Sequence, residues 1–487
     1  MIPMPFKRSG LKAGPGFAGK TSTKEPAPKK VPKEEPKKDL DEEGEGKSGK
    51  TFELLRGFRD ILPEDQGRWN LVRDTIRSIA ESYSFDRIDL PILERSDLFQ
   101  RTIGKGTDIV EKEMYVFTDP SNRSVALRPE ATASAARAYI SHGMLDRPQP
   151  VKLWYLGPMF RHDRPQAGRY RQFYQAGFES FGVDEPIVDA QLIVIGHEIF
   201  KQLGLDVKVE INSIGTPECR AAYLTELVAY FRQHRNKLSE DDKRRLQKNP
   251  LRILDSKEEV TREFLQGAPQ ILDWLDEKSK EHFMKVLEFL EEIEVPYVLN
   301  SYLVRGLDYY SHTVFEFVQA DDSGDGSQSA LGGGGRYDGL VEILGGRPTP
   351  ACGFALGIER IVRALEMKGV NPPERPPARV FFAQLGDASR RVGLKLFEEF
   401  RQAGIPVAEA FGKNALKGQL EAANKLGVEL TLILGQKEVL DGTIIIRDME
   451  SGAQEIVDVK KVVGLVKKKL HQEEGVEPVS QSPVVDS

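Results

Sequence analysis

The chain has 487 residues, of which 39% are hydrophobic, and this length favours several domains that each bury a core of their own. Its 69 lysines and arginines nearly balance 75 aspartates and glutamates, so the net charge of -6 excludes a chain-wide basic field for nucleic acid. Two cysteines, Cys219 and Cys352, are too few for a disulfide framework and lack metal-ligand spacing, as is typical of a reducing compartment. No apolar run approaches the roughly 20 residues of a membrane helix, and we expect a cytoplasmic protein.

The first 50 residues are predicted to be a disordered low-complexity tail, because their Lys, Glu and Pro residues offer little to bury. The lysines could contact RNA weakly, but composition favours a solvated extension. After Pro63, apolar residues recur at intervals of three and four from Trp69 to Tyr83, which predicts a long amphipathic helix. The following segment 85–94, FDRIDLPILE, predicts one strand, and its Pro91 indicates an edge or interface position.

Residues 151–182 predict a long antiparallel hairpin, because two strand-like runs enclose the polar loop HDRPQAG. Strand alternation places five residues on one face: Arg171, Phe173, Gln175, Gly177 and Glu179. We interpret this face as the floor of a polar pocket in which Gly177 makes room for a ligand. The alternative is a solvent-exposed face of the sheet.

Three further segments place polar residues at the ends of predicted elements. In ALRPEATASAARAYI (126–140), Glu130 and Thr132 begin an Ala-rich helix, where free backbone N–H groups gather. The run GGGGRYDGL (332–340) favours a Gly-rich turn, because it lacks the lysine and hydroxyl residue of a P-loop, and the following GFALGIERI (353–361) predicts a strand and then a helix. In LVRGLDYYSHTVFEF (303–317), Arg305 falls in the predicted turn of a hairpin between Pro296–Val304 and Thr313–Val318.

Together these segments resemble the three signature motifs of class II aminoacyl-tRNA synthetases, and more narrowly the histidyl-tRNA synthetases, from Phe52 to about Leu470. GFRDILPED and DLPILE resemble the first motif, which builds the dimer interface in this family. FRHDRPQAGRYRQFYQ resembles the second motif and GFALGIERI the third. LVRGLDYYSHTVFEF and GGGRYDGL are similar to the two peptides specific to the histidine enzymes.

The resemblance implies an α+β catalytic domain with an antiparallel sheet, interrupted by a helical insertion and followed by a C-terminal α/β domain similar to an anticodon-binding domain. The expected boundaries are a tail at 1–50, catalytic parts at 51–215 and 296–370, the insertion at 216–295, the α/β domain at 378–470 and a tail at 471–487. A proline-rich linker, NPPERPPA, precedes the α/β domain. The insertion is locally basic around RQHRNKLSEDDKRRLQKNPLR and would lean over the tRNA acceptor stem, although a solvated helix face explains any single lysine equally well.

The implied activity is that of a histidine–tRNA ligase that consumes ATP with Mg²⁺, releases AMP and pyrophosphate, charges tRNA(His) and works as a homodimer. Its catalytic cations would be Arg161, Arg305 and Arg360, because guanidinium groups stay charged and grip phosphate oxygens in a fork. ATP would contact Arg161, Asp163, Arg169 and Arg360. Histidine would be held by Glu130, Ala131, Thr132, Gln175, Glu179, Tyr309, Tyr310 and Tyr337.

Within this set, Glu179 and Tyr310 are expected to read the imidazole ring, whose N–H donors require buried acceptors. Glu130, Thr132 and Gln175 would hold the α-amino group, and Tyr309 and Tyr337 would form the walls. Three positions depart from the family pattern, and at two of them Asp163 stands where Glu is usual and Ala131 replaces the Gly of RPEGT. Tyr174 stands where His is frequent, and alternation points it away from the substrate face.

Two other interpretations remain at the level of sequence. One is a regulatory subunit that pairs with an ATP phosphoribosyltransferase, although such relatives usually lack the C-terminal domain and erode the histidine peptide. The other is a tRNA-binding scaffold with an inactive site, which would have lost Arg161, Arg305 or Arg360. All three arginines are present.

Overall fold

The computed structural model describes residues 52–104, 106–163, 168–256, 258–320, 330–372 and 378–472. The predicted tail at 1–50 and residues 473–487 of the predicted C-terminal tail lie outside these ranges, as do residues 164–167 of the polar loop and 373–377 of the linker. Within the described ranges, no helix is long and apolar enough to cross a membrane.

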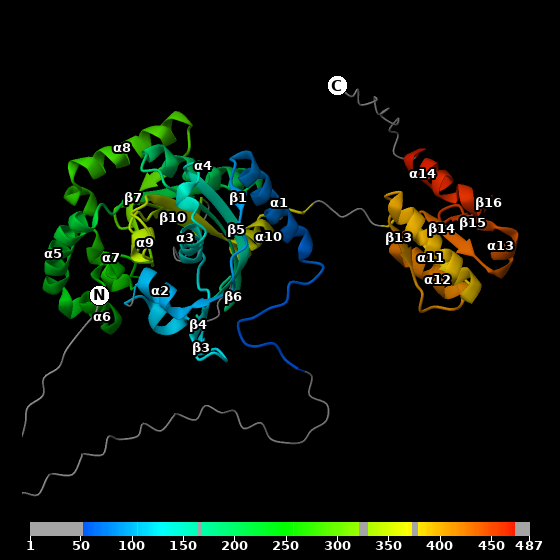
Figure 1. Ribbon diagram of the computed structural model, residues 1–487, viewed down its shortest axis with the longest axis horizontal. Helices are drawn as coiled ribbons and strands as arrows, with labels where there is room; N and C mark the ends of the chain where they lie inside the picture. Colours follow the sequence, from blue (N-terminus) through cyan, green and yellow to red (C-terminus); the bar gives the residue numbers. More distant parts are fainter. Residues whose placement is uncertain are drawn as a thin grey trace, which may run out of the picture. The chain divides into compact units, whose positions relative to one another are not determined.

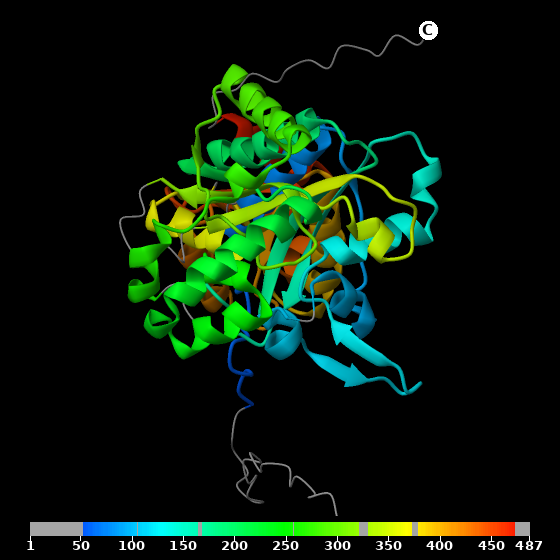
Figure 2. The same cartoon turned by 90° about the vertical axis from the view of Figure 1, so that its left-hand side faces the viewer.

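The described strands form three sheets (Figure 1). The largest has eight strands in the order β1 (Asp86–Arg87), β5 (Val151–Phe160), β6 (Gln172–Phe181), β11 (Ala351–Gly357), β10 (Ala330–Arg336), β9 (Ser311–Gln319), β7 (Val207–Ser213) and β8 (Tyr297–Leu299). A small sheet contains β2 (Leu93–Arg95), β4 (Ser124–Leu127) and β3 (Val116–Thr118), and it projects from its surroundings (Figure 2). The third contains β13 (Val407–Glu409), β12 (Val380–Gln384), β14 (Leu430–Leu434), β15 (Thr443–Asp448) and β16 (Gln454–Asp458).

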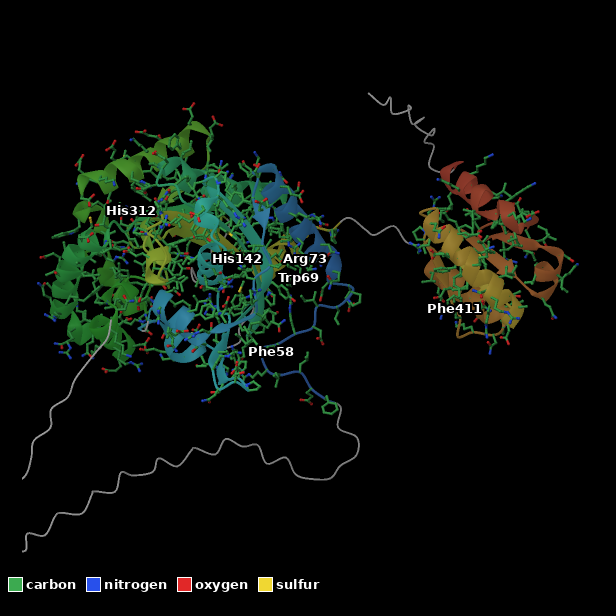
Figure 3. The ribbon with its side chains drawn as sticks, in the orientation of Figure 1. Phe58, Trp69, Arg73, His142, His312 and Phe411 are labelled. Atoms are coloured by element: carbon green, nitrogen blue, oxygen red, sulfur yellow. The ribbon has the colours of Figure 1, made fainter. Side chains whose placement is uncertain are left out.

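One face of the eight-stranded sheet is covered by four helices: α1 (Gln66–Ser82), α4 (Pro186–Gln202), α8 (Glu277–Glu292) and α10 (Ile358–Met367). Their apolar residues pack on the strand side chains of that face, which include Trp154 and Phe178. The predicted amphipathic helix is α1, and its Trp69 contacts the Tyr174 ring edge-on at 5.4 Å between centroids, while Arg73 lies over Trp69 at 5.0 Å (Figure 3). Tyr174 therefore points away from the opposite face, as alternation predicted.

The opposite face of the sheet meets α3 (Thr132–Ser141), α5 (Pro217–Gln233) and α9 (Leu340–Ile343). The predicted hairpin of residues 151–182 is confirmed, because β5 and β6 pair antiparallel with Leu153 opposite Glu179 and Tyr155 opposite Gly177. Alternation sends Trp154 to the first face and Tyr155 to this one. The candidate site lies on this second face.

The predicted hairpin between Pro296–Val304 and Thr313–Val318 is wrong. β8 pairs in parallel with β7, and β9 pairs antiparallel with the other side of β7, so β7 separates the two segments. β7 lies between β9 and β8, and its apolar residues Val207, Val209 and Ile211 are buried. Arg305 therefore lies in an irregular connection between strands that do not pair with each other.

The Gly-rich turn is also wrong, because residues 332–335 belong to β10, which lies between β9 and β11. Neighbouring strands approach this one closely. A Cβ at Gly334 would lie 2.0 Å from the carbonyl oxygen of Gly353, and one at Gly332 would lie 2.7 Å from that of Ala355. The glycines are strand residues that permit this approach.

The single strand predicted for residues 85–94 is instead two strands in two sheets. β1 is an edge strand of the large sheet and β2 belongs to the small sheet, with Leu90 and Pro91 between them. Carbonyl oxygens of these two residues accept hydrogen bonds from Arg128 Nη1, at 2.7 and 3.4 Å. A buried arginine therefore holds the chain where it passes from one sheet to the other.

Between β7 and β8 the chain is helical, as predicted for the insertion. It contains α5, α6 (Glu240–Lys248), α7 (Glu259–Leu265) and α8, with single turns at Arg235–Lys237, Pro250–Ile253 and Ile271–Trp274. Elsewhere the structure has α2 (Ser96–Thr102), a π-helical turn at Ile109–Glu113 and a 3₁₀ turn at Met144–Asp146.

Residues 378–472 form an α/β unit, as predicted. Its parallel strands β13, β12 and β14 are extended by antiparallel β15 and by β16, a strand that the sequence patterns did not indicate. The helices are α11 (Asp387–Gln402), α12 (Leu416–Leu426), α13 (Gln436–Asp441) and α14 (Val462–Gln472), with a 3₁₀ turn at Val459–Lys461. The core contains Phe382, Phe400, Leu432 and Ile444, all fully buried.

Candidate active site

A cavity of about 660 Å³ lies on the second face of the large sheet. Residues from β6, β10 and β11, from the start of α3 and from segment 305–310 line it, and residues of the insertion close one side. The predicted site residues that line it are Glu130, Thr132, Arg161, Asp163, Arg169, Gln175, Arg305, Tyr309, Tyr310 and Arg360. The three others, Ala131, Glu179 and Tyr337, are buried and do not line the cavity.

Glu179 lies beneath the cavity floor with none of its surface exposed. Three hydroxyl groups donate to its carboxylate: Thr132 Oγ1 at 2.8 Å, Tyr155 OH at 3.0 Å and the hydroxyl of Tyr337. Burial raises the pKa of Glu179 to about 8, although these three hydrogen bonds favour the ionised form and lower it. The carboxyl group of Glu179 therefore lies at the centre of a buried hydrogen-bond network with these three hydroxyl groups.

Gly177 does not make room for a ligand, contrary to the prediction. A Cβ at this position would lie 2.3 Å from the hydroxyl oxygen of Tyr155 and 2.2 Å from the ring carbon that bears it. The glycine instead lets the Tyr155 ring cross the strand and bring its hydroxyl to Glu179. Tyr155 is a cavity residue that sequence reasoning missed, and its place opposite Gly177 in the hairpin was the available signal.

Glu130 and Thr132 lie at the N-terminus of α3. The carboxylate of Glu130 accepts from the backbone N–H of Thr132 at 2.7 Å and from that of Ala133 at 3.1 Å, which satisfies free donors of the first helical turn. Burial raises the pKa of Glu130 nonetheless. Ala131 precedes the helix with φ −122°, a conformation that does not require glycine, and its side chain packs in the core.

Tyr309, Tyr310 and Tyr337 form an aromatic cluster at one end of the cavity. The ring centroids are 4.7 Å apart for Tyr309 and Tyr310, and 5.6 Å apart for Tyr309 and Tyr337. Tyr309 and Tyr310 reach the cavity, while Tyr337 lies behind them and donates to Glu179. The rings of this cluster are tilted or edge-on to one another, so they form an aromatic wall that carries hydroxyl groups.

Arginines occupy the part of the cavity away from Glu179. Arg161 Nε donates to the carbonyl oxygen of Pro129 at 2.8 Å, and its guanidinium lies over the Phe173 ring at 5.3 Å. Arg360 Nη1 donates to the carbonyl oxygen of Ala330 at 2.6 Å. Burial lowers the pKa of both, and for Arg360 the nearby charge of Arg169 lowers it further. Such a set of cations suits an anionic ligand.

Two further predicted residues, Asp163 and Arg169, form an ion pair at the cavity rim. Arg169 Nη1 lies 3.2 Å from Asp163 Oδ2, and each side chain is about one-third exposed, at 32% and 33%. Arg305 is more deeply placed: it pairs with Glu316 of β9 and lies 5.8 Å from the centre of the Tyr310 ring.

Eight carboxylates that line the cavity were not predicted as site residues, and three of them contact or face the polar groups described above: Glu113, Glu316 and Glu359. Glu359 accepts from the backbone N–H of Tyr174 at 3.0 Å, and burial raises its pKa to about 7. Burial also raises the pKa of Glu113, which faces Arg161. Glu316 had a signal, because it is the one charged residue in the apolar run Thr313–Val318. Glu113 had none, because its π-helical turn follows no simple period.

Comparison with known proteins places this geometry in a family. The family model described as histidyl-tRNA synthetase matches residues 57–361, and the model described as anticodon binding domain matches residues 380–469. The histidine–tRNA ligase of Dehalococcoides mccartyi is 45% identical over 420 residues, which cover 86% of this chain and all of that protein.

The chain belongs to the histidyl-tRNA synthetase family. The histidine–tRNA ligase of Halorhodospira halophila is 47% identical over 414 residues, covering 84% of this chain and 96% of its own.

Among solved structures of the family, that of apo histidyl-tRNA synthetase from S. aureus is similar with a TM-score of 0.70 and 36% identity, covering 86% of this chain and all of that chain. A Bacillus halodurans structure, titled as an ATP phosphoribosyltransferase regulatory subunit/histidyl-tRNA synthetase, matches with a TM-score of 0.55 and 22% identity over 80% of this chain and 99% of that one. That likeness extends to the fold alone.

Proposed function

We propose that the chain is a histidine–tRNA ligase, which activates L-histidine with ATP to histidyl-adenylate and pyrophosphate and then transfers histidine to the 3′ end of tRNA(His). One observation carries the proposal within this family: guanidinium groups from three separate segments, those of Arg161, Arg305 and Arg360, line one cavity. A regulatory or scaffolding relative would have no need to keep these three cations together.

In the activation step, a carboxylate oxygen of histidine attacks the α-phosphorus of ATP. The bond from that phosphorus to the β-phosphate oxygen breaks, and pyrophosphate leaves. Negative charge gathers between two anions, so fixed cations stabilise the transition state. The attacking carboxylate is already ionised, and therefore no side chain needs to act as a base. In this scheme Arg161 and Arg360 hold the outer phosphates and Arg305 meets the α-phosphate.

We propose that ATP also contacts the rim pair of Asp163 and Arg169, and that Mg²⁺ enters with the nucleotide. Among the described residues, no group of three or more His, Cys, Asp or Glu side chains could hold a metal ion alone. Mg²⁺ commonly binds one or two carboxylates together with substrate phosphates. Glu113 and Glu359 are two of the cavity carboxylates that could complete such a site.

For histidine, we propose that Glu130, Thr132 and Gln175 hold the α-amino group, that Tyr309 and Tyr310 enclose the ring, and that Tyr337 braces them. Glu179 acts from beneath the floor, because the hydroxyl groups of Thr132 and Tyr155 that it orients both line the cavity. Tyr310 adds a hydroxyl for the imidazole. Ala131 contributes by fixing the backbone between Glu130 and Thr132.

Residues 378–470 are proposed to bind the anticodon. Single-stranded RNA is recognised by stacking of unpaired bases on exposed aromatic rings beside cations. Phe411 is 45% exposed and is followed by Lys413 and Asn414 (Figure 3). The basic part of the insertion is proposed to approach the acceptor stem.

We also propose that the enzyme is a cytoplasmic homodimer. Both cysteines are free and buried, which suits a reducing compartment. The small sheet and the residue that precedes it expose four large apolar residues, namely Ile92, Leu93, Val116 and Phe117, each 42–48% exposed. A second copy of the chain would cover such a surface. Light scattering on the purified chain tests this, and a monomeric mass at working concentrations would contradict it.

The activity itself is tested by histidine-dependent exchange of labelled pyrophosphate into ATP. Exchange with histidine, and none with the other amino acids, is expected. Charging of tRNA(His) tests the second step. A folded chain without histidine-dependent exchange would contradict the proposed function and would favour a regulatory or RNA-binding role.

A further inference from the structure

Arg305 is held by a carboxylate that belongs to the same face of the sheet. Arg305 Nη1 donates to Glu316 Oε1 from the adjoining strand β9. The Arg305 side chain is 18% exposed and that of Glu316 is 25% exposed, so both are largely screened from water. Among the described residues, Glu316 is the carboxylate with which Arg305 forms an ion pair.

Gly333 leaves the space in which this ion pair lies. It lies opposite Glu316 in the register of β10 and β9. A Cβ at Gly333 would lie 2.9 Å from Arg305 Nη1 and 3.0 Å from Glu316 Cγ, and only 2.5 Å from the carbonyl oxygen of Phe315. Any larger residue would displace the guanidinium or the carboxylate, so the geometry of the pair is fixed by three separate segments.

The position of Glu316 is electrostatically costly. Burial raises its pKa, and the nearby carboxylates of Asp255 and Glu210 raise it further, while Arg305 lowers it. Burial by itself lowers the pKa of Arg305, but the charge of Glu316 raises it above its usual range. A negative charge in a cavity for anions also opposes ATP binding. The presence of Glu316 is explained if holding Arg305 in one orientation stabilises the transition state by more than the Glu316 charge weakens ATP binding.

We propose that Glu316 is a positioning residue for histidine activation, which holds the guanidinium of Arg305 in the orientation that meets the α-phosphate. The inference rests on the proposed function. Glu316 itself touches no reacting atom in this scheme. Because Arg305 would otherwise rotate about its long side chain, loss of Glu316 lowers the rate of the chemical step more than it weakens substrate binding.

The test is a double-mutant cycle on pyrophosphate exchange with the full-length chain. Glu316→Gln keeps the shape of the side chain and removes its charge. It is expected to lower kcat at least ~10-fold, with the KM values for histidine and ATP changed much less. In an Arg305→Ala background the same substitution is expected to have little further effect on kcat, because Glu316 then has no guanidinium to orient. Glu316→Asp, which keeps the charge, is expected to recover part of the rate.

Glu210 offers a matched control. It lies opposite Glu316 on β7, but its carboxylate accepts from Asn300 Nδ2 at 2.7 Å. Glu210→Gln should leave kcat near that of the unmodified chain. A second pair of variants uses glycines: Gly333→Ala should lower kcat as Glu316→Gln does, whereas Gly339→Ala should not, because no atom lies within 4 Å of its added Cβ.

Two outcomes would overturn the inference. If Glu316→Gln exchanged pyrophosphate as fast as the unmodified chain or faster, Glu316 would be a competitor of phosphate for Arg305. If the substitution cost the same factor with and without Arg305, Glu316 would act by another route. Both outcomes require an active unmodified chain, so neither is confused with failure of the proposed function, in which the unmodified chain itself shows no histidine-dependent exchange.

Discussion

The eight-stranded and five-stranded sheets have similar apolar cores, but they differ in what else they bury. Among the described residues before 378, seven charged side chains are buried: Arg128, Glu130, Glu179, Asp189, Asp242, Arg336 and Glu359. Among the described residues of 378–472, the buried polar residues are all neutral: Gln384, Ser389, Gln419 and Thr431. A buried charge costs several kcal/mol unless it is paired. The region around the large sheet carries this cost, whereas residues 378–472 avoid it.

The difference follows from where each region meets its ligand. Histidine and ATP phosphates are small, and their recognition requires fixed donors and cations in a cavity that excludes water. An RNA loop, the ligand proposed for residues 378–470, is read on a surface, where exposed aromatic groups suffice, and Phe411 is exposed there. Buried charge therefore marks the region proposed for chemistry, and the following predictions test that contrast.

The largest effect is expected from the pair of Asp189 and Arg336, both fully buried, in which Arg336 Nε lies 3.1 Å from Asp189 Oδ2. Burial alone would raise the pKa of Asp189, but Arg336 and His282 lower it to about 2. Asp189→Asn leaves the buried guanidinium short of countercharge, and we expect a loss of about 3–5 kcal/mol in unfolding free energy, measured in urea.

The matched control is Glu455→Gln in the C-terminal unit, which breaks an exposed ion pair with Lys469 at 3.2 Å. Exposed pairs contribute about 0–1 kcal/mol, so this variant should unfold close to the unmodified chain. Equal losses for the two variants would remove the contrast between the sheets.

Next in size is the effect of Arg305→Ala on adenylate formation. By analogy with loss of one preorganised donor, the single-turnover rate should fall at least ~10²-fold. The dissociation constants of histidine and ATP should move much less, and transfer from preformed adenylate to tRNA should be nearly unchanged because no phosphorus is attacked there. Arg305→Lys should recover little, since a point charge does not reproduce the guanidinium fork. Normal activation with slow transfer would refute the assignment.

Glu179→Gln is expected to weaken use of histidine far more than use of ATP. The loss in kcat/KM for histidine should be roughly 1–3 kcal/mol, because the hydroxyl groups that donate to Glu179 would be mispaired. The raised pKa of Glu179 also predicts that the stability of the unmodified chain depends on pH. The folded-state pKa of Glu179 is about 8, above its ordinary 4.5, so the folded state retains a proton that the unfolded chain releases. Stability is therefore lost as pH rises from about 5 to 8, by at most about 1.4 kcal/mol per pH unit.

Glu179→Gln should lack this slope, which urea unfolding at several pH values would show. Unchanged histidine kinetics together with an unchanged slope would remove Glu179 from the proposed site. Glu198→Gln, in a partly exposed helical pair with Lys201, serves as the control for a change of charge alone.

The smallest effect on activation is expected from truncation after Lys368, which removes residues 369–487. Pyrophosphate exchange should continue at the same rate, because every residue of the cavity precedes the cut. Charging of tRNA should fall strongly. If both activities fell equally in a variant that still folds and assembles as the full-length chain does, the proposed division of labour between the two sheets would be contradicted.

Local chemistry allowed much of this molecule to be predicted from its sequence. The 3.6-residue period gave α1, two strand-like runs around a polar loop gave the β5–β6 hairpin, and the resemblance to the family motifs pointed to Arg161, Arg305 and Arg360, which the structure brings to one cavity. These signals are short in range, because each depends on neighbouring residues or on groups whose charge survives in any environment. The roles assigned to the site residues stay predictions.

The tertiary structure alone decided how distant strands pair and what each side chain faces. β7 separates β8 from β9, the glycines of 332–335 form a strand, and Tyr155 fills the space above Gly177. Glu179 became a buried carboxylate beneath three hydroxyl groups, and Glu316 a partner of Arg305. Strand order and burial depend on contacts between segments far apart in the chain, and the sequence pattern of one segment does not contain the partner that it will meet.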